Sequence, residues 1–360
     1  MDISILSYFS GGGFLDLGFE LENFKTVWSN EISIEISEIY NSGMSSTLNK
    51  DMKISSNNSI SDIDISSHKK NMIKKINSKI WGIIGGPPCP DFSVGGKNKG
   101  RNGDLGKLSQ IYVNHICELQ PSFFVFENVK GLVKTKKHKE FFIELIEQLK
   151  KNGYAVDYKL LNALNFGIPQ DRERIIMLGV KKNLYNQVFN KKYIDEYNWF
   201  PWPNEKYPDA KNAFEWNKID DTETLKKIPN ELKVGNYILD QGKLSMLPNS
   251  NEYFNPKSSK FDEIKEGDTS KKSFKRLHRN KYSPTVAYGN NEVHLHPEQK
   301  RRLSVREALR IQTVPDSYVI NGNISLSTKF KVIGNGVPVK LANEIAKSIK
   351  NLLNKAIKSN

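Results

Sequence analysis

Between residues 3 and 180, short apolar runs alternate with longer stretches whose apolar residues recur at helical spacing. In the stretch 139–150, for example, Phe142, Leu145 and Leu149 fall on one helical face. Strands that alternate with helices are typical of a parallel sheet covered by helices on both faces. The first half of the chain is therefore predicted to be a doubly wound α/β domain. The expected strands are 3–9, 25–29, 80–85, 122–127, 156–161 and 175–180.

Residues 183–298 are rich in Trp, Pro, Tyr, Asn and Lys and have no sustained helical or strand period. This texture indicates a smaller second domain of irregular loops and short strands. Helical spacing returns at 304–312 and again at 339–356, and the last of these helices is expected to pack on the first domain. The predicted domains are residues 1–181 with 331–360, and residues 182–330.

The charge balance favours a polyanionic partner, because 54 Lys and Arg face 40 Asp and Glu, a net charge of +14. An AT-rich genome that favours Lys codons is the alternative explanation. No apolar run approaches the roughly 18 residues of a membrane span, and the start has no basic leader before a cleavable apolar stretch. A cytoplasmic protein without a membrane partner is expected.

The chain has only two cysteines, Cys89 and Cys117. Two are too few for a disulfide framework or a thiolate metal cluster, so both are expected to be reduced thiols. Cys117 lies in the apolar, helix-like run IYVNHICEL and is expected in the core. No metal site is expected.

A glycine run, FSGGG at 9–13, follows the first expected strand. Glycines at a strand-to-helix turn let backbone amides approach a nucleotide closely. The GxGxxG pattern of dinucleotide dehydrogenases is absent, because Phe14 and Asp16 intervene. Glu31 ends the next strand about 20 residues on, where an acidic side chain holds ribose hydroxyls. A flexible turn without a ligand is the alternative.

The run GGPPCP at 85–90 places three prolines around Cys89, at the end of another apolar strand. Prolines fix the backbone, so the thiol points in one direction, which a merely buried cysteine does not require. Glu127 closes the strand FFVFE at the same edge of the sheet. An apolar environment there raises a carboxyl pKa and suits a hydrogen bond to a neutral heterocycle, whereas a solvated strand end is the alternative.

The run QDRER at 170–174 begins the last expected strand, where alternation places Arg172 and Arg174 on one side. Paired guanidinium groups suit a phosphate or a base carbonyl. Ion pairs with Asp171 or Glu173 are the structural alternative.

Together, GGPPC, FENV, QDRER, RRLSVREALRIQTVPDSY and KVIGNGVPV resemble, in order and spacing, the cytosine carbon-5 methyltransferase family of bacterial modification enzymes. The resemblance covers nearly the whole chain except its middle. It implies a Rossmann-like large domain that binds S-adenosylmethionine, a small target-recognition domain, and a cleft for duplex DNA between them. Since one chain holds the whole apparatus, a monomer is expected, and a cognate restriction endonuclease is a further candidate partner.

The resemblance also implies residue roles in the cofactor pocket. Phe9 stacks on the adenine of the cofactor, Asp62 hydrogen-bonds that adenine, and Glu31 holds the ribose. The other residues implied to line the pocket are Gly11, Gly13, Pro88, Leu108, Asn335 and Val337.

The resemblance also implies a reaction mechanism. Carbon 5 of cytosine is too weak a nucleophile to attack a sulfonium methyl group unaided, so the enzyme must first activate the ring. The Cys89 thiolate attacks carbon 6 of a flipped-out cytosine. Glu127 holds ring nitrogen 3, and Arg174, with Arg172 nearby, grips the base carbonyl.

Two basic segments are candidates for DNA contact. The Gly- and Lys-rich stretch 93–107 has the composition of a mobile loop that closes over DNA, and 271–296 mixes basic residues with Tyr and Asn. A solvated basic surface is the alternative for both. His294 and His296 lie on a candidate strand without other metal ligands, so they predict no metal site. The DNA-contact candidates are Ser93, Lys97, Lys99, Gln170, Lys275, Arg276 and Arg279.

Three positions depart from the family's usual pattern. Pro90 stands where glutamine is usual, Phe14 replaces a common glycine, and Ser7 replaces a frequent aspartate. None of the three removes a group that the chemistry needs, but Pro90 lacks an amide N–H. Pro90 leaves open a catalytically silent DNA-binding protein of the same fold, and an RNA cytosine-5 methyltransferase of that fold is the other alternative.

Overall fold

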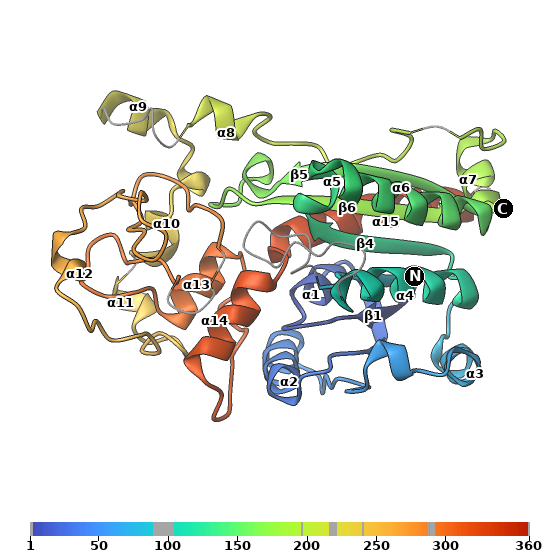
Figure 1. The fold of residues 1–360 in the computed structure, drawn as a ribbon, viewed down its shortest axis with the longest axis horizontal. Coiled ribbons are helices and arrows are strands. Elements are labelled where there is room, and N and C mark those ends of the chain that lie inside the picture. Colours follow the sequence, from blue (N-terminus) through green and yellow to red (C-terminus); the bar gives the residue numbers. More distant parts are fainter. Residues whose placement is uncertain are drawn as a thin grey trace.

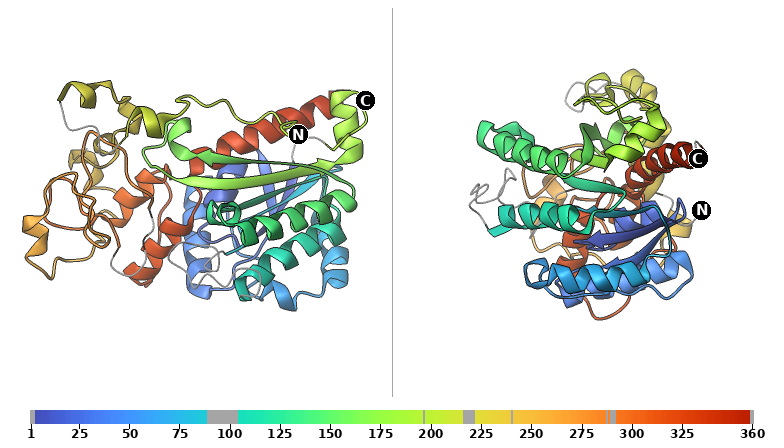
Figure 2. Two further views of the ribbon diagram at one scale, coloured as in Figure 1. Left: turned by 45° about the horizontal axis from the view of Figure 1, so that its top comes forward. Right: turned by 90° about the vertical axis from the view of Figure 1, so that its right-hand side faces the viewer.

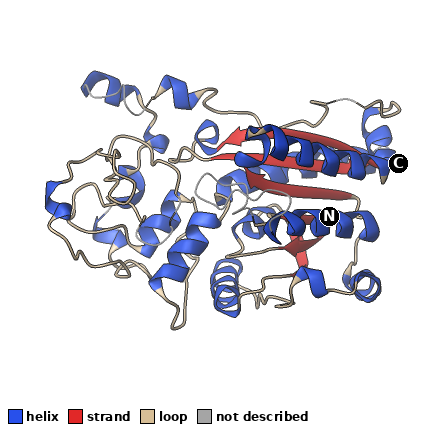
Figure 3. Cartoon of the chain, in the orientation of Figure 1, coloured by secondary structure: helices blue, strands red, loops and turns tan. Residues whose placement is uncertain are grey.

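The computed structural model describes residues 3–88, 104–195, 197–215, 222–239, 241–286, 288 and 292–358. A twisted sheet with helices on both faces forms one part, and a less regular part lies beyond one end of the strands (Figure 1, Figure 3). The two parts share buried apolar side chains, so the chain packs as one body.

The sheet has six strands in the order β2-β1-β3-β4-β6-β5. Each lies within two residues of its predicted ends, and most of their side chains are buried, as expected of strands covered on both faces. The strands are β1 (Ile3–Tyr8), β2 (Phe24–Ser29), β3 (Trp81–Gly85), β4 (Phe123–Val129), β5 (Tyr154–Asn162) and β6 (Glu173–Lys181).

The prediction of a wholly parallel sheet was wrong for one strand. β6 runs antiparallel to both of its neighbours, β4 and β5, while the other pairs are parallel. Only residues 163–172 join β5 to β6, and they hold the short 3₁₀ helix η3 (Ala163–Phe166). A parallel connection needs a crossover of a dozen or more residues, so this short link reverses the chain instead.

Two sets of helices cover the sheet. α1 (Phe14–Glu20), α7 (Lys182–Phe189) and α15 (Val339–Lys358) pack on one face, and α3 (Ile65–Lys75), α4 (Asp104–Leu119) and α6 (Lys136–Lys151) pack on the other (Figure 2). The C-terminal helix thus returns to the first domain, as its apolar stripe predicted. Gly18 permits the close contact of α1 with α15, because a Cβ there would lie 2.4 Å from the Ala342 Cβ.

The predicted short strands of the irregular part were wrong, since its described residues hold short helices and isolated β-bridges but no strand. Buried arginine side chains supply hydrogen bonds that neighbouring strands would supply in a sheet. The Arg276 guanidinium donates to the carbonyl oxygens of Ile264 and His296, and Arg302 donates to that of Ser273. Side chains thereby satisfy loop carbonyls that a sheet would otherwise pair.

The segment that follows β6 packs with the sheet. Leu184, Tyr185, Trp199 and Phe200 are buried in the same core as α15. No helix among the described residues is long and apolar enough to cross a membrane. The remaining helices are α2 (Ile34–Leu48), η1 (Ile60–Asp62), α5 (Gly131–Lys134), α8 (Ala210–Ala213), α9 (Thr222–Lys227), η5 (Asn230–Leu232), α10 (Gly235–Ile238), α11 (Gln241–Leu244), α12 (Lys260–Glu263), α13 (Val305–Ile311) and α14 (Leu326–Asn335).

Candidate active site

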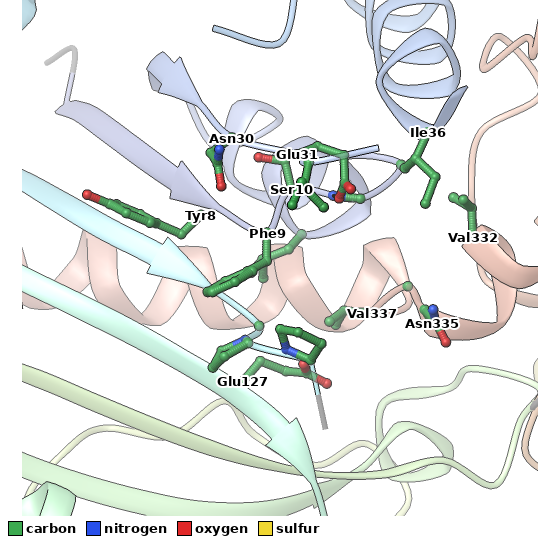
Figure 4. A pocket seen from close by; sticks show the side chains of 18 of the residues that line it. Tyr8, Phe9, Ser10, Asn30, Glu31, Ile36, Glu127, Val332, Asn335 and Val337 are labelled. Atoms are coloured by element: carbon green, nitrogen blue, oxygen red, sulfur yellow. The ribbon is translucent and has the colours of Figure 1, made fainter. Parts of the chain in front are cut away.

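A cavity of about 690 Å³ lies at the carboxyl ends of β1 to β4, where they meet the start of α15 (Figure 4). This volume is within the range of small-molecule and cofactor sites. The position also matches the rule that ligands of open α/β sheets bind outside the carboxyl ends of the strands. The lining segments are 8–12, 14–16, 30–33, 58–60, 86–88, 127–129, 331–332 and 335–337, together with Ile36, Leu108 and Arg174.

The glycine run after β1 forms one wall of the cavity. Phe9, Gly11 and Gly13 have φ values of 54°, 54° and 79°, in the left-handed region. For Phe9 this conformation costs roughly 1–2 kcal/mol, a strain that folded proteins concentrate at functional sites. A Cβ on Gly13 would lie 2.8 Å from both Met44 and Tyr40. The run is therefore a fixed turn rather than a flexible one.

Glu31 follows β2, and its carboxylate holds this turn in place. Its Oε2 accepts a hydrogen bond from the Gly11 amide at 3.1 Å, and its Oε1 accepts one from the Ser33 amide at 2.9 Å. Burial raises the pKa of the Glu31 carboxyl, and these two amides and Lys331 oppose the rise. The carboxylate keeps lone pairs for ligand hydroxyl groups, as an acceptor for ribose requires.

Glu127 and Arg174 form an ion pair at the far side of the cavity. The Arg174 Nε lies 2.9 Å from the Glu127 Oε1, and both side chains are nearly buried. Burial raises the pKa of the Glu127 carboxyl, while Arg174 and Arg172 lower it. Burial and the two arginines therefore shift the pKa of Glu127 in opposite directions. Such a perturbed carboxyl is typical of active sites, where a group exchanges a proton with a ligand.

The loop before Cys89 is built around Glu127. A Cβ on Gly86 would lie 2.7 Å from the Glu127 Oε2, so any larger residue at this position would displace the Glu127 carboxylate. The Asn128 amide donates to the Pro87 carbonyl at 3.3 Å and ties the loop after β3 to the end of β4. Pro88 lines the cavity, whereas Cys89 itself lies outside the described residues.

Arg172 has surroundings that differ from those of Arg174. It is fully buried, does not line the cavity, and donates to the carbonyl oxygens of Val286, Gly334 and Asn335 at 3.1, 3.0 and 3.2 Å. The charge of Arg174 is close enough to lower the pKa of Arg172 further, after burial. The two arginines are neighbours as predicted, yet only Arg174 faces the cavity.

The comparisons with known proteins fit this geometry. Residues 3–351 match the model of the family described as C-5 cytosine-specific DNA methylase. This chain belongs to that family. It is 44% identical to the Type II methyltransferase M.NmeDI of Neisseria meningitidis serogroup C, over 97% of this chain and 84% of the relative. It is 31% identical to M.FnuDI of Fusobacterium nucleatum, over 98% of this chain and 95% of the relative.

Solved structures agree on the fold. The S. pombe Dnmt2 methyltransferase covers 98% of each chain with a TM-score of 0.61 at 16% identity. The Entamoeba histolytica methyltransferase EhMeth covers 98% of each chain with a TM-score of 0.63 at 14% identity. Together with the family match, this makes the chain a DNA cytosine carbon-5 methyltransferase of α/β fold, related to enzymes of restriction-modification systems.

The family implies S-adenosylmethionine as cofactor, and the cavity of this methyltransferase fits such a molecule. The left-handed glycine turn, the Glu31 carboxylate and the apolar walls suit a nucleoside. Two residues implied for the pocket do not line the cavity: Gly13 lies behind the turn against α2, and Asp62 is exposed at the end of η1. The implied residues that do line it are Phe9, Gly11, Glu31, Pro88, Leu108, Asn335 and Val337.

Of the candidate DNA contacts, Ser93, Lys97 and Lys99 lie outside the described residues. Gln170 and Arg276 are buried: the Gln170 amide donates to Gln312 at 3.0 Å, and the Arg276 guanidinium donates to loop carbonyls. These positions favour roles in holding the fold. Lys275 and Arg279 are partly exposed, and Arg279 pairs with Glu266 and Glu298 at 2.9 and 2.6 Å.

Three further residues singled out in the sequence, one cysteine and two histidines, have surroundings that determine their protonation. Burial raises the pKa of the Cys117 thiol to about 11, so this cysteine, which is partly buried on α4 against the core, stays a protonated thiol. Burial lowers the pKa of His294 and His296, which keeps both neutral. No group of three potential metal ligands occurs among the described residues.

Sequence reasoning missed several residues that line the cavity, among them Asn30, Lys331 and Asp16. Asn30 holds the cavity edge, because its amide donates to the carbonyls of Ser56 and Asn58 at 3.0 and 2.9 Å. The position of Asn30 directly before Glu31 was a usable signal. Asp16 had been noted only as a break in the GxGxxG pattern.

Proposed function

We propose that this methyltransferase moves a methyl group to carbon 5 of a flipped-out cytosine within a short, specific duplex DNA sequence, through a covalent bond from Cys89 to carbon 6. The Glu127–Arg174 pair supports the proposal most directly. It faces the cofactor cavity at the end of β4, beside the Pro88 that immediately precedes Cys89.

Each proposed step uses one of these groups. The Cys89 thiolate adds to carbon 6, and the displaced electron pair makes carbon 5 nucleophilic. Glu127 holds or protonates ring nitrogen 3, which makes carbon 6 more electrophilic, and its raised pKa favours that proton. Arg174 orients Glu127 and offsets charge on the base carbonyl. S-adenosylmethionine supplies the methyl group, and loss of the carbon-5 proton with release of Cys89 completes the reaction.

The target base must leave the duplex, because its ring faces are stacked there. We propose that residues 1–181 with 331–360 bind the cofactor and catalyse, and that residues 182–330 recognise DNA, with 182–200 as their anchor on the sheet. Lys97 and Lys99 would close over the DNA, and Lys275 and Arg279 would contact it. A monomer is the proposed state, and a restriction endonuclease of the same specificity is the proposed partner.

Cytosine-conversion sequencing of DNA from a methylation-free host tests this function. The host expresses the wild-type chain, the Cys89→Ser variant or the Cys117→Ser variant. We expect methylated cytosines at one short motif with the wild type and with Cys117→Ser, which makes the same chemical change at a partly buried thiol away from the cavity. Cys89→Ser should lose them all, and retained methylation in that variant would refute the covalent mechanism.

Duplex DNA that carries a mechanism-based cytosine analogue tests the covalent bond itself. A denaturation-resistant complex with the wild type, absent with Cys89→Ser, is the expected result. Salt-sensitive DNA binding without trapping or methylation would instead favour the silent binding protein. Transfer to RNA but not to duplex DNA would favour the RNA enzyme.

A further inference from the structure

A buried carboxylate lies in the wall of the cofactor cavity, below the glycine turn. Asp16, in the first turn of α1, lines the cavity and is fully buried. Its Oδ1 accepts a hydrogen bond from the Ser7 hydroxyl at 2.7 Å, and its Oδ2 accepts one from the Tyr40 hydroxyl at 3.0 Å. Both donors are neutral.

No positive charge compensates this carboxylate within the described part of the chain, where Asp16 has no ion-pair partner. Glu20, a like charge on the same helix, raises the pKa of the Asp16 carboxyl further. Tyr40 on α2 and Tyr318 ahead of α14 also face it, and burial and the carboxylate raise the pKa of both hydroxyls, so they stay neutral. Glu31 and Lys331 line the same cavity.

Burial accordingly raises the pKa of Asp16 to about 7, although the hydrogen bonds from the two hydroxyl groups lower it. An uncompensated buried charge is costly, and its usual remedies are protonation or a partner of opposite sign. In most buried sites that partner belongs to the chain. Here the carboxylate borders a cavity large enough for a ligand, so the partner can arrive with that ligand.

We propose that Asp16 is the counter-charge for the cationic amino-acid end of the cofactor, and that it thereby sets cofactor affinity and its dependence on pH. The end of S-adenosylmethionine opposite its adenine carries an α-ammonium, a sulfonium and a carboxylate, so two positive groups outweigh one negative group. Glu31 suits the ribose hydroxyls and Glu127 is paired with Arg174, which leaves Asp16 as the carboxylate for the charged end. This inference deepens the proposed function and rests on it.

The neighbours of Asp16 explain how a carboxylate is placed there. Ser7 lies on β1, and its hydroxyl donates to the Asp16 carboxylate across the glycine turn. Ser10 extends the network, because its hydroxyl donates to the Ser7 oxygen at 2.9 Å.

Calorimetric titration of the full-length protein tests the proposal with three ligands: S-adenosylmethionine, its uncharged-sulfur product S-adenosylhomocysteine, and adenosine. The variant is Asp16→Asn, which keeps the shape and removes the charge; the two neighbouring hydroxyls can reverse their hydrogen bonds to suit the amide. Asp51→Asn is the matched control, because it removes the same charge from an exposed side chain.

At pH 8 we expect Asp16→Asn to weaken S-adenosylmethionine binding by about 10- to 100-fold, because a buried charge attracts a cation in the cavity through a medium of low dielectric constant. Adenosine binding should be unchanged, and Asp51→Asn should match the wild type for every ligand. Equal weakening for S-adenosylhomocysteine would assign Asp16 to the ammonium, and weakening for S-adenosylmethionine alone would assign it to the sulfonium. A change of less than twofold for both ligands would overturn the proposal.

The wild type provides a second, independent measurement if Asp16→Asn fails to fold. Below about pH 7 Asp16 is protonated and the counter-charge is lost, so S-adenosylmethionine affinity should fall as the pH drops from 8 to 6. Adenosine affinity reports Glu31 and the rest of the cavity over the same range and should fall less. Parallel curves for the two ligands would overturn the proposal, whereas a wild type that binds no S-adenosylmethionine at any pH would overturn the proposed function itself.

Discussion

At the scale of single residues, the site contains buried carboxyl groups whose negative charge is only partly compensated by neighbouring positive charges. Glu127 has two arginines beside it, and Asp16 has none. Strand ends and glycine turns are readable from sequence, so Glu31 and Glu127 could be predicted from it. The role of Asp16 could not, because it depends on Ser7 and Tyr40 meeting it in space. Asp62 illustrates the reverse case: its motif was readable, yet its exposed side chain lies outside the cavity lining.

A pH–rate profile of an Arg174→Gln variant tests the balance at Glu127. Arg174 lowers the pKa of the Glu127 carboxyl, so its removal should raise that pKa further. A higher pKa keeps the proton on Glu127 to higher pH, and the alkaline limb of kcat should move upward in pH while the maximal rate falls about 10-fold or more. Lys130→Gln, which removes an exposed cation paired with Glu173, is the control and should leave the profile in place. An alkaline limb that moves downward would contradict the assignment.

At the scale of elements, local patterns determined which segments became strands, but not how the last strand runs. The six strands were predictable because each is a compact apolar run bounded by turn residues. The reversal of β6 depends on the short link after β5, a feature of chain length rather than of apolar pattern. That reversal brings the start of β6 to the cavity, where Arg174 meets Glu127 and Arg172 reaches Val286.

Arg172→Lys tests whether β6 anchors its surroundings. Lysine keeps the charge but cannot reach three carbonyl oxygens on two segments, so we expect a loss of about 1.5–3 kcal/mol in the free energy of unfolding, measured by urea denaturation. Asn335 lines the cavity, so S-adenosylmethionine affinity should fall as well. Arg279→Lys, in a partly exposed ion pair, should cost less than about 1 kcal/mol. An Arg172→Lys protein with wild-type stability would exclude the anchoring role.

At the scale of the whole molecule, the irregular part and the cofactor part share a core. Apolar residues of α1 and α2 are buried together with those of α10, α13 and α14. Such contacts join residues far apart in the sequence. The composition of the irregular part was therefore enough to recognise it, but not to predict how its segments pack on the cofactor part. Tyr318 is the clearest single link: its hydroxyl donates to the Gly12 carbonyl at 2.6 Å and lies 3.2 Å from that of Ile39.

Removing that hydroxyl should therefore affect both stability and the cofactor site. Tyr318→Phe leaves the Gly12 and Ile39 carbonyls without this donor in a buried position, at a cost of about 1–3 kcal/mol in the free energy of unfolding. Because Gly12 belongs to the turn that lines the cavity, the apparent affinity for S-adenosylmethionine should fall with it, and added cofactor should recover part of the lost stability. Urea denaturation with and without cofactor measures both effects. Tyr197→Phe, which removes a hydroxyl from a half-exposed ring, is the matched control and should change neither quantity. If Tyr318→Phe lost stability but bound cofactor as tightly as the wild type, the hydroxyl would hold the two parts together without shaping the cavity.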